Sequence, residues 1–143
     1  MIVTSPRTSA EFERYYALRY DILRKPWNQP PGSEKDELES DSMHAMLMND
    51  QGELTGVCRM QFNSAEEAQL RYMAISGNMQ GKGTGRLLLE YFEQIAREHK
   101  IRRIVLQARE KAINFYLRNG YSVVEKSYLM WGEIQHYRME KVL

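Results

Sequence analysis

The segment from Gln69 to His99 reads QLRYMAISGNMQGKGTGRLLLEYFEQIAREH and combines a strand, a glycine-rich turn and a helix. Its first seven residues are mostly apolar and have the length of a buried strand. In its last part, apolar side chains at positions 88, 91, 92 and 95 recur at helical spacing. Between them, three glycines within five residues allow a tight turn and leave no side chain in the way of a ligand. Because the first turn of a helix favours anions, this segment predicts a phosphate or pyrophosphate site.

Two common phosphate-binding motifs do not fit this turn. A Walker loop requires four residues between its first glycine and a Gly-Lys pair, followed by Ser or Thr. Here Gly77 and Gly81 enclose only three residues, and Lys82 is followed by Gly83. The dinucleotide fingerprint requires a third glycine where this chain has Arg86. Binding of a nucleoside triphosphate is therefore disfavoured.

The pattern that does fit is Gln/Arg-x-x-Gly-x-Gly/Ala, with Gln80, Gly83 and Gly85 at its fixed positions. It resembles the coenzyme A pyrophosphate loop of the GNAT superfamily of N-acetyltransferases. A second segment, residues 108–121, is similar to the next motif of that family. The residues that match this second motif are Ala112, Phe115, Tyr116, Gly120 and Tyr121. The two motifs follow each other in the family's order, so the resemblance covers about residues 43–143 and, more loosely, the N-terminal part.

Length and composition are typical of one soluble globular domain. The chain has 143 residues, of which 43% are apolar and 27% charged. A net charge of +1 gives no field that would attract nucleic acid or a membrane, and the single cysteine, Cys58, excludes an intrachain disulfide. There is no apolar leader segment and no run near the ~20 apolar residues that span a bilayer. We expect one domain over residues 1–143 in the cytoplasm, with no nucleic-acid or membrane partner, and leave a homodimer open.

Periodicity and turn residues predict a mixed, mostly antiparallel central sheet flanked by helices. Thr8 or Ser9 is expected to cap the first helix, and Asn119-Gly120 to end the last one. The expected elements are strands at 1–4, 43–48, 54–62, 69–75, 103–107, 121–130 and 134–142, and helices at 10–24, after the glycine turn, and at 110–118. The order β-α-βββ-α-β-α-ββ gives the α/β (α+β) class. It matches the acyl-CoA N-acyltransferase fold that the GNAT resemblance implies.

Two features before the second strand have a structural and a functional interpretation. Trp27 lies in the loop over residues 25–33, where it packs under the loop or forms a wall of an acceptor pocket. Residues 34–42 carry five acidic side chains, which we interpret as a solvated turn. The alternative is that their summed field attracts a cationic amine.

Acetyl transfer from a thioester to an amine requires hydrogen-bond donors for the developing oxyanion, a base for the amine and a proton for the departing thiolate. The resemblance implies that the backbone of Met73, Ala74 and Ile75 binds the pantetheine arm, with one N–H reaching the thioester oxygen. The pyrophosphate loop that it implies consists of Gln80, Gly81, Lys82, Gly83, Thr84, Gly85 and Arg86.

The resemblance also implies two roles on the helix at 110–118. Tyr116 is the expected general acid, and it also contacts the cofactor; the alternative is a packing aromatic like Phe115. A phenol has a pKa of about 10 and a thiol about 8.5, so proton donation to the thiolate needs help from positioning. Asn114 is expected to bond to a pantetheine amide, with a solvent-facing residue as the alternative.

The motifs do not specify the general base. Many GNAT members carry a glutamate on the fourth strand, but residues 69–75 contain no carboxylate. His44 and His136 are the remaining groups that titrate near neutral pH, and we take His136 as the catalytic candidate. A strand histidine is often structural, and a water relayed through the backbone is the alternative. Cys58 lies in an apolar strand and is interpreted as a buried small hydrophobe rather than a nucleophile.

The acceptor amine is expected between residues 19–27 and the final hairpin at 131–136. These segments carry polar and aromatic groups that the cofactor does not use. The candidate substrate-binding residues are Arg19, Arg24, Trp27 and Glu133. The two arginines are about 140° apart around a helix, so at most one should point into the cleft. An arginine there would favour an acceptor that also bears a carboxylate.

The sequence thus predicts an acetyl-CoA-dependent N-acetyltransferase that transfers the acetyl group directly to a primary amine of a small molecule or peptide. Acetyl-CoA is its cosubstrate, and no metal is expected. The alternative is a non-catalytic acyl-CoA-binding sensor or subunit with the same fold. Tyr116 favours the enzyme, whereas the missing carboxylate on the fourth strand keeps the sensor open.

Overall fold

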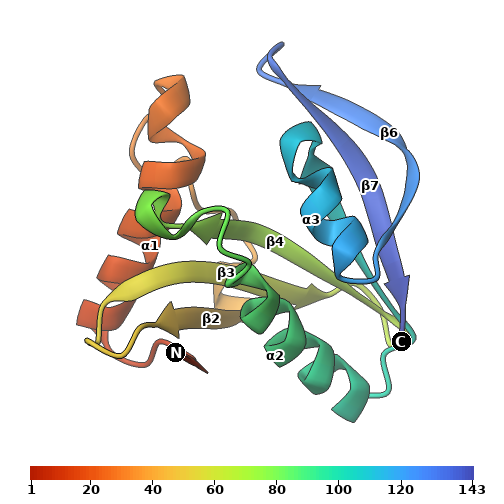
Figure 1. Ribbon diagram of the computed structural model, residues 1–143, viewed down its shortest axis with the longest axis horizontal. Helices are drawn as coiled ribbons and strands as arrows, with labels where there is room; N and C mark the ends of the chain where they lie inside the picture. Colours follow the sequence, from red (N-terminus) through yellow and green to blue (C-terminus); the bar gives the residue numbers. More distant parts are fainter. The chain divides into compact units, whose positions relative to one another are not determined.

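The computed structural model describes all 143 residues, with seven strands and three α-helices (Figure 1). The strands are β1 (Ile2–Thr4), β2 (Met43–Met48), β3 (Leu54–Phe62), β4 (Glu67–Ile75), β5 (Arg103–Arg109), β6 (Ser122–Met130) and β7 (Ile134–Val142). The helices are α1 (Ser9–Leu23), α2 (Gly85–Glu98) and α3 (Ile113–Arg118). Short 3-10 helices are η1 (Lys25–Trp27), η2 (Glu39–Asp41), η3 (Gly77–Met79) and η4 (Glu110–Ala112). The predicted order of elements is confirmed.

The strands form one sheet in the order β1-β2-β3-β4-β5-β7-β6. β4 and β5 pair in parallel, while β1 with β2, β2 with β3, β5 with β7 and β6 with β7 pair antiparallel. The parallel ladder joins residues 67–70 of β4 to residues 103–106 of β5. β5 continues to pair with β7 as far as Arg109. The predicted mixed, mostly antiparallel sheet flanked by helices is therefore confirmed.

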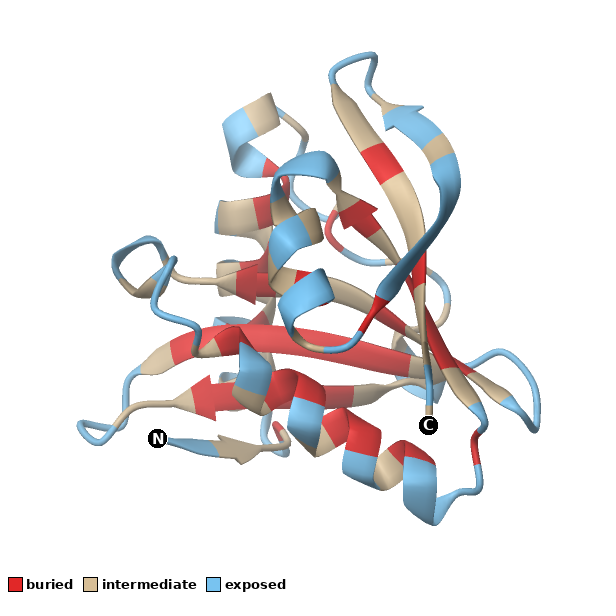
Figure 2. Ribbon diagram, turned by 45° about the vertical axis from the view of Figure 1, so that its right-hand side comes forward, coloured by how far each residue is buried: buried red, intermediate tan, exposed pale blue.

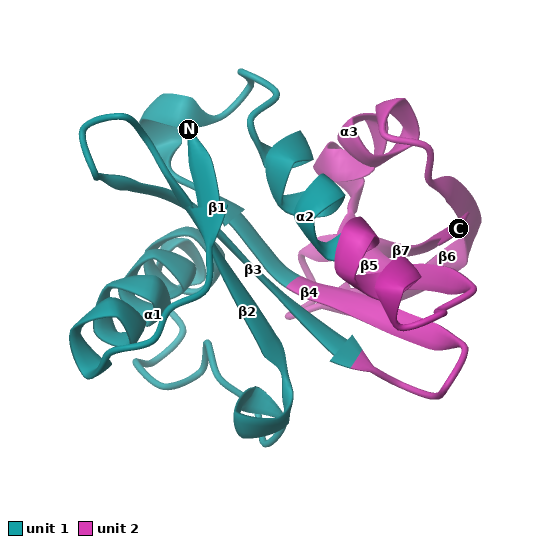
Figure 3. Cartoon of the chain, turned by 90° about the horizontal axis from the view of Figure 1, so that it is seen from below, with its two compact units in different colours: residues 1–61, 72–92 teal, residues 62–71, 93–143 magenta.

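The chain divides into two compact units, drawn in separate colours in Figure 3. The first unit consists of residues 1–61 and 72–92, and the second of residues 62–71 and 93–143. The boundaries fall inside β3, β4 and α2, so these elements contribute residues to both units. The expected single domain stays a prediction.

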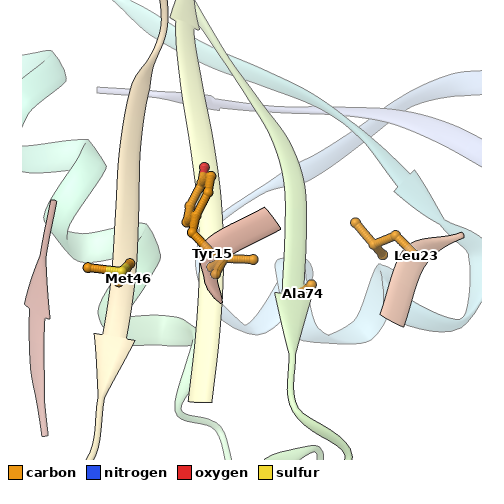
Figure 4. Packing of buried hydrophobic residues seen from close by; sticks show 5 residues of the cluster. Tyr15, Leu23, Met46 and Ala74 are labelled. Atoms are coloured by element: carbon orange, nitrogen blue, oxygen red, sulfur yellow. The ribbon is translucent and has the colours of Figure 1, made fainter. Parts of the chain in front are cut away.

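In the first unit, α1 packs on one face of the strands. Its side chains Tyr15 and Leu23 form a buried cluster with Met46 from β2 and Ala74 from β4 (Figure 4), joined by Val57 from β3. α1 begins with a capping box, because the Thr8 side chain accepts from the Glu11 N–H while the Glu11 carboxylate accepts from the Thr8 N–H. This confirms Thr8 as one of the two predicted caps.

The opposite face of these strands packs against α2. Alternate residues of a strand point to opposite faces, so Gly56 faces away from α1 when its neighbour Val57 faces toward it. A Cβ atom at Gly56 would lie 2.8 Å from Ile75 Cδ1 and 3.3 Å from Leu88 Cδ1. Glycine at this position therefore lets β4 and α2 approach β3 closely. Figure 2 shows the result as a nearly continuous buried β3 and a buried stripe along α2.

In the second unit, β5 and β7 carry the core and β6 is the exposed edge of the sheet. Ile104, Leu106 and Met139 are buried, whereas nearly all of β6 is exposed (Figure 2). Two register shifts interrupt the pairing of β6 with β7. Such bulges, with the charged side chains of Glu125 and Lys126, are features that discourage an edge strand from further pairing.

The last helix ends at the predicted Asn119-Gly120 cap, in a Schellman motif. The Tyr121 N–H donates to the Tyr116 carbonyl (3.0 Å), and the Gly120 N–H to the Leu117 carbonyl (3.2 Å). Gly120 has φ +91°, a conformation that only glycine adopts without strain. The helix predicted at 110–118 begins as the 3-10 turn η4 and becomes α-helical only at Ile113. None of the three helices has both the length and the apolarity to span a bilayer.

Candidate active site

The glycine loop in the first unit presents backbone donors without partners. Gly81 and Gly83 have φ of +79° and +74°, which places both in the left-handed region. The N–H groups of residues 81–84 donate no hydrogen bond within the protein. No atom lies within 4 Å of where a side chain at either glycine would begin. The loop therefore leaves both its donors and the space in front of them open to a ligand.

The loop is tied to the end of β4. The Gln80 side-chain amide donates to the Ile75 carbonyl (2.9 Å), and the Ser76 N–H donates to the Thr55 carbonyl of β3 (2.9 Å). Of the predicted pantetheine-binding residues, Ala74 is buried in the α1 cluster, while Met73 and Ile75 are half-buried. The predicted pyrophosphate loop and the predicted pantetheine strand are therefore contiguous within one unit.

Thr84 gives a separate indication of a ligand at this loop. Its Oγ1 atom is buried and has no hydrogen-bond partner. An unpaired buried hydroxyl is costly, and such groups are rare outside functional sites. A phosphate oxygen placed against the loop would supply the missing partner, and the side chains of Lys82 and Arg86 are exposed beside it. The residues present therefore fit a pyrophosphate group.

Immediately before the predicted pantetheine strand, Tyr72 has a strained backbone. Its φ is +58°, although it is an aromatic residue inside β4. A bulky non-glycine residue in the left-handed region costs about 1–3 kcal/mol and persists only where its surroundings enforce it. Pairing of β4 with β5 stops at Leu70, two residues earlier. The regular strand geometry is thus lost where the acyl group is expected to bind.

Tyr72 lies in a buried cluster of opposite charges. We call it the guanidinium cluster, and it consists of Arg19, Arg59, Asp36, Glu39 and Tyr72. Both arginine side chains have no exposed surface. The Arg59 guanidinium contacts Asp36 (2.6 Å) and Glu39 (2.7 Å), and Arg19 contacts Glu39 (3.0 Å). Only the Nε atoms of the two arginines are buried without a hydrogen-bond partner.

The solvated interpretation of residues 34–42 is therefore wrong for three of the five acidic side chains. Asp36 and Glu39 have side chains 16% and 13% exposed, and Glu34 is buried. The physical reason is that two arginines buried in the unit require counter-charges, and this segment supplies them. The carboxylates of Asp36 and Glu39 are thus occupied by the protein's own cations, and that of Glu34 accepts from the Gly32 N–H (2.7 Å).

His44, one of the two histidines considered as a base, is buried beside this cluster. Its Nδ1 lies 2.8 Å from the Tyr15 hydroxyl, and its Nε2 lies 2.8 Å from the Glu39 carbonyl. Because a carbonyl can only accept, Nε2 carries a proton, and Nδ1 of the neutral ring accepts from Tyr15. Burial lowers the pKa of His44, which keeps this neutral form at physiological pH. Both ring nitrogens are occupied within the first unit.

The predicted acceptor residues of the first unit are mostly buried. Arg19 donates to the Glu34 carbonyl (3.0 Å) and the Tyr15 hydroxyl (2.9 Å), in addition to its ion pair. Arg24 is 6% exposed and donates to the carbonyls of Ser33 (3.0 Å) and Leu23 (2.9 Å). Trp27 is half-buried in η1. Substrate binding by these residues stays a prediction, and the contacts of Arg19 give it a structural role.

In the second unit, Tyr116 is 7% exposed, and its ring packs edge-on against Phe115 (5.0 Å between centroids) and Tyr121 (5.8 Å). The Tyr121 hydroxyl in turn donates to the buried Glu93 carboxylate (2.9 Å), which Lys141 also contacts (2.9 Å). These contacts fix the ring of Tyr116 in one orientation. Asn114 is exposed on the same helix. The catalytic and cofactor roles of both residues stay predictions.

The last hairpin carries the other predicted residues of the second unit. His136 is buried, its ring stacks on Tyr128 (4.3 Å between centroids), and its Nδ1 lies 3.0 Å from the Ile134 carbonyl. Glu133 and Trp131 are exposed in the turn between β6 and β7. The proposed roles of His136 and Glu133 are untested by this geometry.

Cys58 is fully buried, as predicted for a small hydrophobe. Burial raises the pKa of its thiol to about 12, so almost no thiolate is present at neutral pH. This environment does not suit a nucleophile. Sequence reasoning missed Arg59 and Tyr72, although a charged residue inside the apolar run of β3 was a signal that a buried counter-charge must exist.

Comparison with known proteins agrees with this geometry. Residues 12–121 match the acetyltransferase (GNAT) family. A relative, the uncharacterized N-acetyltransferase YjcF of Bacillus subtilis (strain 168), is 25% identical over 126 residues, covering 88% of this chain and 89% of that protein.

Solved structures share the fold over almost the whole chain. An aminoglycoside 6′-N-acetyltransferase complexed with coenzyme A superposes with a TM-score of 0.81 at 15% identity, covering 99% of this chain and 97% of that one. An acyl-CoA N-acyltransferase from Pseudomonas aeruginosa gives 0.80 at 24% identity, covering 98% and 97%. With the family match over residues 12–121, these likenesses establish that the chain belongs to the acetyltransferase (GNAT) family of enzymes.

Proposed function

We propose that this chain transfers the acetyl group of acetyl-CoA directly to a primary amine of a small molecule or peptide. The observation that carries the proposal is the loop of residues 81–84, with its unpartnered N–H groups and the orphaned hydroxyl of Thr84. Backbone donors at the start of a helix are suited to a pyrophosphate, and coenzyme A contains one. Membership of the acetyltransferase family supports the thioester as the reactive end.

The roles of the chain's own residues follow from this assignment. Residues 80–86 bind the pyrophosphate, and the backbone of residues 73–75 binds the pantetheine arm. When bound, acetyl-CoA supplies the activated acyl group. Tyr116 gives a proton to the departing thiolate sulfur, and Asn114 bonds to a pantetheine amide. The packing of Tyr116 between Phe115 and Tyr121 supports this role, because a general acid must be held in a fixed orientation.

His136 is the side chain that we propose removes the proton from the amine. His44 is occupied on both nitrogens, and its lowered pKa makes it a weak base. Glu67, at the start of β4, accepts from the Asn63 amide (2.9 Å) and pairs with Arg103 (2.9 Å); both contacts lower the pKa of its carboxyl and make it a weak base. We therefore keep His136 as the proposed base, with water relayed through the backbone as the alternative.

Coenzyme A binding is tested with the same substitution at two glycines, one inside the loop and one outside it. Gly83→Asp adds a negative charge and a side chain at φ +74° in the loop, so calorimetry should show affinity for coenzyme A weakened at least tenfold, or about 1.4 kcal/mol. Gly77→Asp makes the same change in η3, outside the loop and without a positive φ, and should bind nearly as wild type. Equal effects of the two variants would refute the placement of the pyrophosphate.

The general acid is tested with a matched pair of tyrosines. Tyr116→Phe should lower turnover by roughly 10² to 10⁴-fold, much more than it weakens binding of acetyl-CoA, because a general acid acts in the transition state. Tyr121→Phe removes a hydroxyl that bonds to Glu93 and should cost stability rather than turnover. Wild-type turnover in Tyr116→Phe, with chemistry rate-limiting, would remove Tyr116 from the mechanism.

The acceptor is found by a screen of acetyl-CoA-dependent thiol release over polyamines, amino acids, aminoglycosides and peptides. An amine that releases thiol and gains an acetyl group identifies the acceptor class. Tight coenzyme A binding without release of thiol for any acceptor class would favour the sensor instead.

A further inference from the structure

The sheet of the second compact unit, magenta in Figure 3, has a core face and a polar face. Residues directly opposite each other on paired strands share a face, and so do alternate residues along one strand. The core face carries Leu106 of β5 and its partner Met139 of β7, which are both buried. The next pair, Gln107 with Arg138, therefore lies on the polar face. His136, two residues from Arg138 on β7, lies on that face as well.

The guanidinium group of Arg138 donates no hydrogen bond within the protein. Its one ion pair, with Glu67, spans 3.8 Å, which is beyond hydrogen-bond length. Glu67 accepts instead from Arg103 at 2.9 Å, and Glu125, opposite Arg138 on β6, forms no ion pair with it. The Nε atom of Arg138 is buried without a partner. Because unpaired buried donors are costly and uncommon, this guanidinium group is suited to an acceptor from outside the chain.

Gln107 adds a second donor beside Arg138. Its side-chain oxygen accepts from the Ser127 hydroxyl of β6 (2.6 Å), which fixes the orientation of the amide. The amide nitrogen donates no hydrogen bond within the protein. Both Gln107 and Arg138 are half-buried, so solvent reaches them. A guanidinium and an amide nitrogen form a set of donors only, which suits an anion, and the planar fork of the guanidinium matches a carboxylate.

His136, the proposed base, has a defined protonation pattern on the same face. Its Nδ1 lies 3.0 Å from the Ile134 carbonyl, and because a carbonyl only accepts, Nδ1 carries the proton of the neutral ring. The lone pair of the neutral ring is therefore on Nε2, the nitrogen that can take a proton from an amine. Two residues along a strand span about 6.5–7 Å. The spacing of His136 and Arg138 thus suits an acceptor whose amine and carboxylate are a few bonds apart.

We infer that the acceptor is an amino acid, whose carboxylate is bound by Arg138 and Gln107 while its amine lies at His136. This inference rests on the proposed function, because it takes His136 as the base. It also assigns carboxylate recognition to residues other than Arg19 and Arg24, the arginines expected from the sequence. Those two are engaged with a carboxylate and with carbonyl groups of the chain itself.

Three variants separate the contact with the carboxylate from the general charge of the polar face. Arg138→Gln removes the guanidinium group. Gln107→Glu keeps an acceptor for the Ser127 hydroxyl but replaces the amide donor with a negative charge. Arg103→Gln is the matched control, because Arg103 lies on the same face and its side chain is 39% exposed, against 37% for Arg138. It removes the same charge at a site away from Gln107.

The acceptors to be tested are the common amino acids, each paired with the amine that lacks its α-carboxylate, such as lysine with cadaverine and histidine with histamine. Phosphoethanolamine is a further acceptor, because a guanidinium group also binds phosphate. Acetyl-CoA-dependent thiol release gives kcat and KM for each acceptor. Calorimetry gives the affinity of each acceptor for the complex of the full-length protein with coenzyme A.

Wild type should use at least one amino acid, with a kcat/KM at least tenfold above that of the matched amine, because hydrogen bonds to charged groups are strong. Arg138→Gln should lose this preference through a higher KM for the amino acid. Gln107→Glu should reverse it, and Arg103→Gln should keep it. Affinity for coenzyme A should stay within about threefold in all three variants, because none of them changes the glycine loop.

Equal or better use of the matched amines would overturn the inference and leave the proposed function standing. So would a preference for phosphoethanolamine over every amino acid, or loss of the preference in Arg103→Gln, which would make the effect one of net charge. If Arg138→Gln does not fold, the reversal in Gln107→Glu decides. Absence of thiol release with every acceptor would refute the proposed function, and the preference measured by calorimetry would then decide the inference by itself.

Discussion

The glycine loop and the guanidinium cluster lie in the same compact unit and treat their polar atoms in opposite ways. In the loop, the N–H groups of residues 81–84 and the hydroxyl of Thr84 have no partner inside the protein. In the cluster, Arg19 and Arg59 are fully buried, yet their terminal nitrogens contact carboxylates at 2.6–3.0 Å. The loop leaves its backbone donors open to solvent or a ligand, whereas in the cluster only the Nε atoms of Arg19 and Arg59 have no hydrogen-bond partner.

This difference shows which polar groups mark a binding site. Buried charge and perturbed titration are often taken as signs of function, and the cluster has both. Its carboxylates and the terminal nitrogens of its arginines are satisfied by each other, so these charges support the architecture. The loop carries one buried orphan atom, Thr84 Oγ1, and backbone donors that face open space, where an anion has room to bind. Donors that face open space are therefore stronger evidence for a ligand site than buried charge alone.

The largest expected effect comes from breaking the cluster. Arg59→Met should lower the free energy of unfolding by about 3–5 kcal/mol, because it leaves the carboxylates of Asp36 and Glu39 buried with too few cations. Urea denaturation followed by fluorescence measures this change. Binding of coenzyme A by the folded fraction should be close to wild type, because the loop does not contact the cluster's charges.

Arg102→Met is the control for this prediction. Arg102 forms an ion pair with Glu66 at 3.7 Å, but both side chains are more than half exposed. Exposed pairs contribute about 0–1 kcal/mol, so its removal should be nearly silent. If Arg59→Met lowered the free energy of unfolding as little as Arg102→Met, the ion pairs of Arg59 would contribute no more than exposed pairs do.

The same two regions show which structural features can be predicted from the sequence. The strand, turn and helix around the loop were predicted correctly because they are local: all three lie within 31 residues. The order of the elements and the class of the sheet followed from similar local patterns. The cluster was missed because Arg59 meets Asp36 and Glu39 across 23 and 20 positions of sequence. No local pattern encodes that pairing, and the acidic segment by itself resembles a solvated turn.

The left-handed conformation of Tyr72 also could not be predicted from the local sequence. Tyrosine favours extended backbone, and residues 69–75 have the composition of an ordinary strand. The ring of Tyr72 lies against Arg19 of α1 and Arg59 of β3, and no local pattern encodes these contacts.

Smaller effects are expected from a substitution at Thr84. It should leave the stability of the free protein unchanged or slightly raised, but it should weaken the binding of coenzyme A. Thr84→Val replaces the orphaned Oγ1 with a methyl group of similar size, so the free protein should be as stable as wild type or slightly more stable. If Oγ1 bonds to a phosphate oxygen, affinity for coenzyme A should fall by about tenfold, since a hydrogen bond to a charged group contributes about 1.5–3 kcal/mol.

Thermal melts with and without coenzyme A measure both effects of Thr84→Val in one experiment. Thr55→Val is the contrasting variant, because the Thr55 hydroxyl is also buried but donates to the Leu47 carbonyl (3.1 Å). That variant should lose stability and keep its affinity. Reduced stability of the free Thr84→Val protein, with unchanged affinity, would mean that the loop is not completed by a ligand.

The smallest effect concerns the pH dependence that the buried cluster gives to folding. His44 lies between the Tyr15 hydroxyl and the Glu39 carbonyl, with Arg19 and Arg59 nearby, and burial is the main cause of its lowered pKa. In the unfolded chain its pKa is about 6.5. Below pH 6.5, His44 is protonated in the unfolded chain but still neutral in the folded protein, whose His44 has a lower pKa. Lowering the pH through this range therefore favours the unfolded state.

The contribution of His44 is therefore fully present above pH 6.5 and is lost as the pH falls through the folded pKa, with a slope of at most about 1.4 kcal/mol per pH unit. A pocket of about 560 Å³, lined in part by His44, Phe12 and Tyr16, gives solvent access to the ring, so the proton can enter without global unfolding. Urea denaturation of wild type and His44→Gln between pH 7.5 and 5 separates this slope from that of the carboxylates. The variant should be less stable at pH 7.5 and should lose less stability than wild type as the pH falls. Parallel curves for the two proteins would show that His44 does not titrate in this range and that the pH dependence of folding comes from other groups.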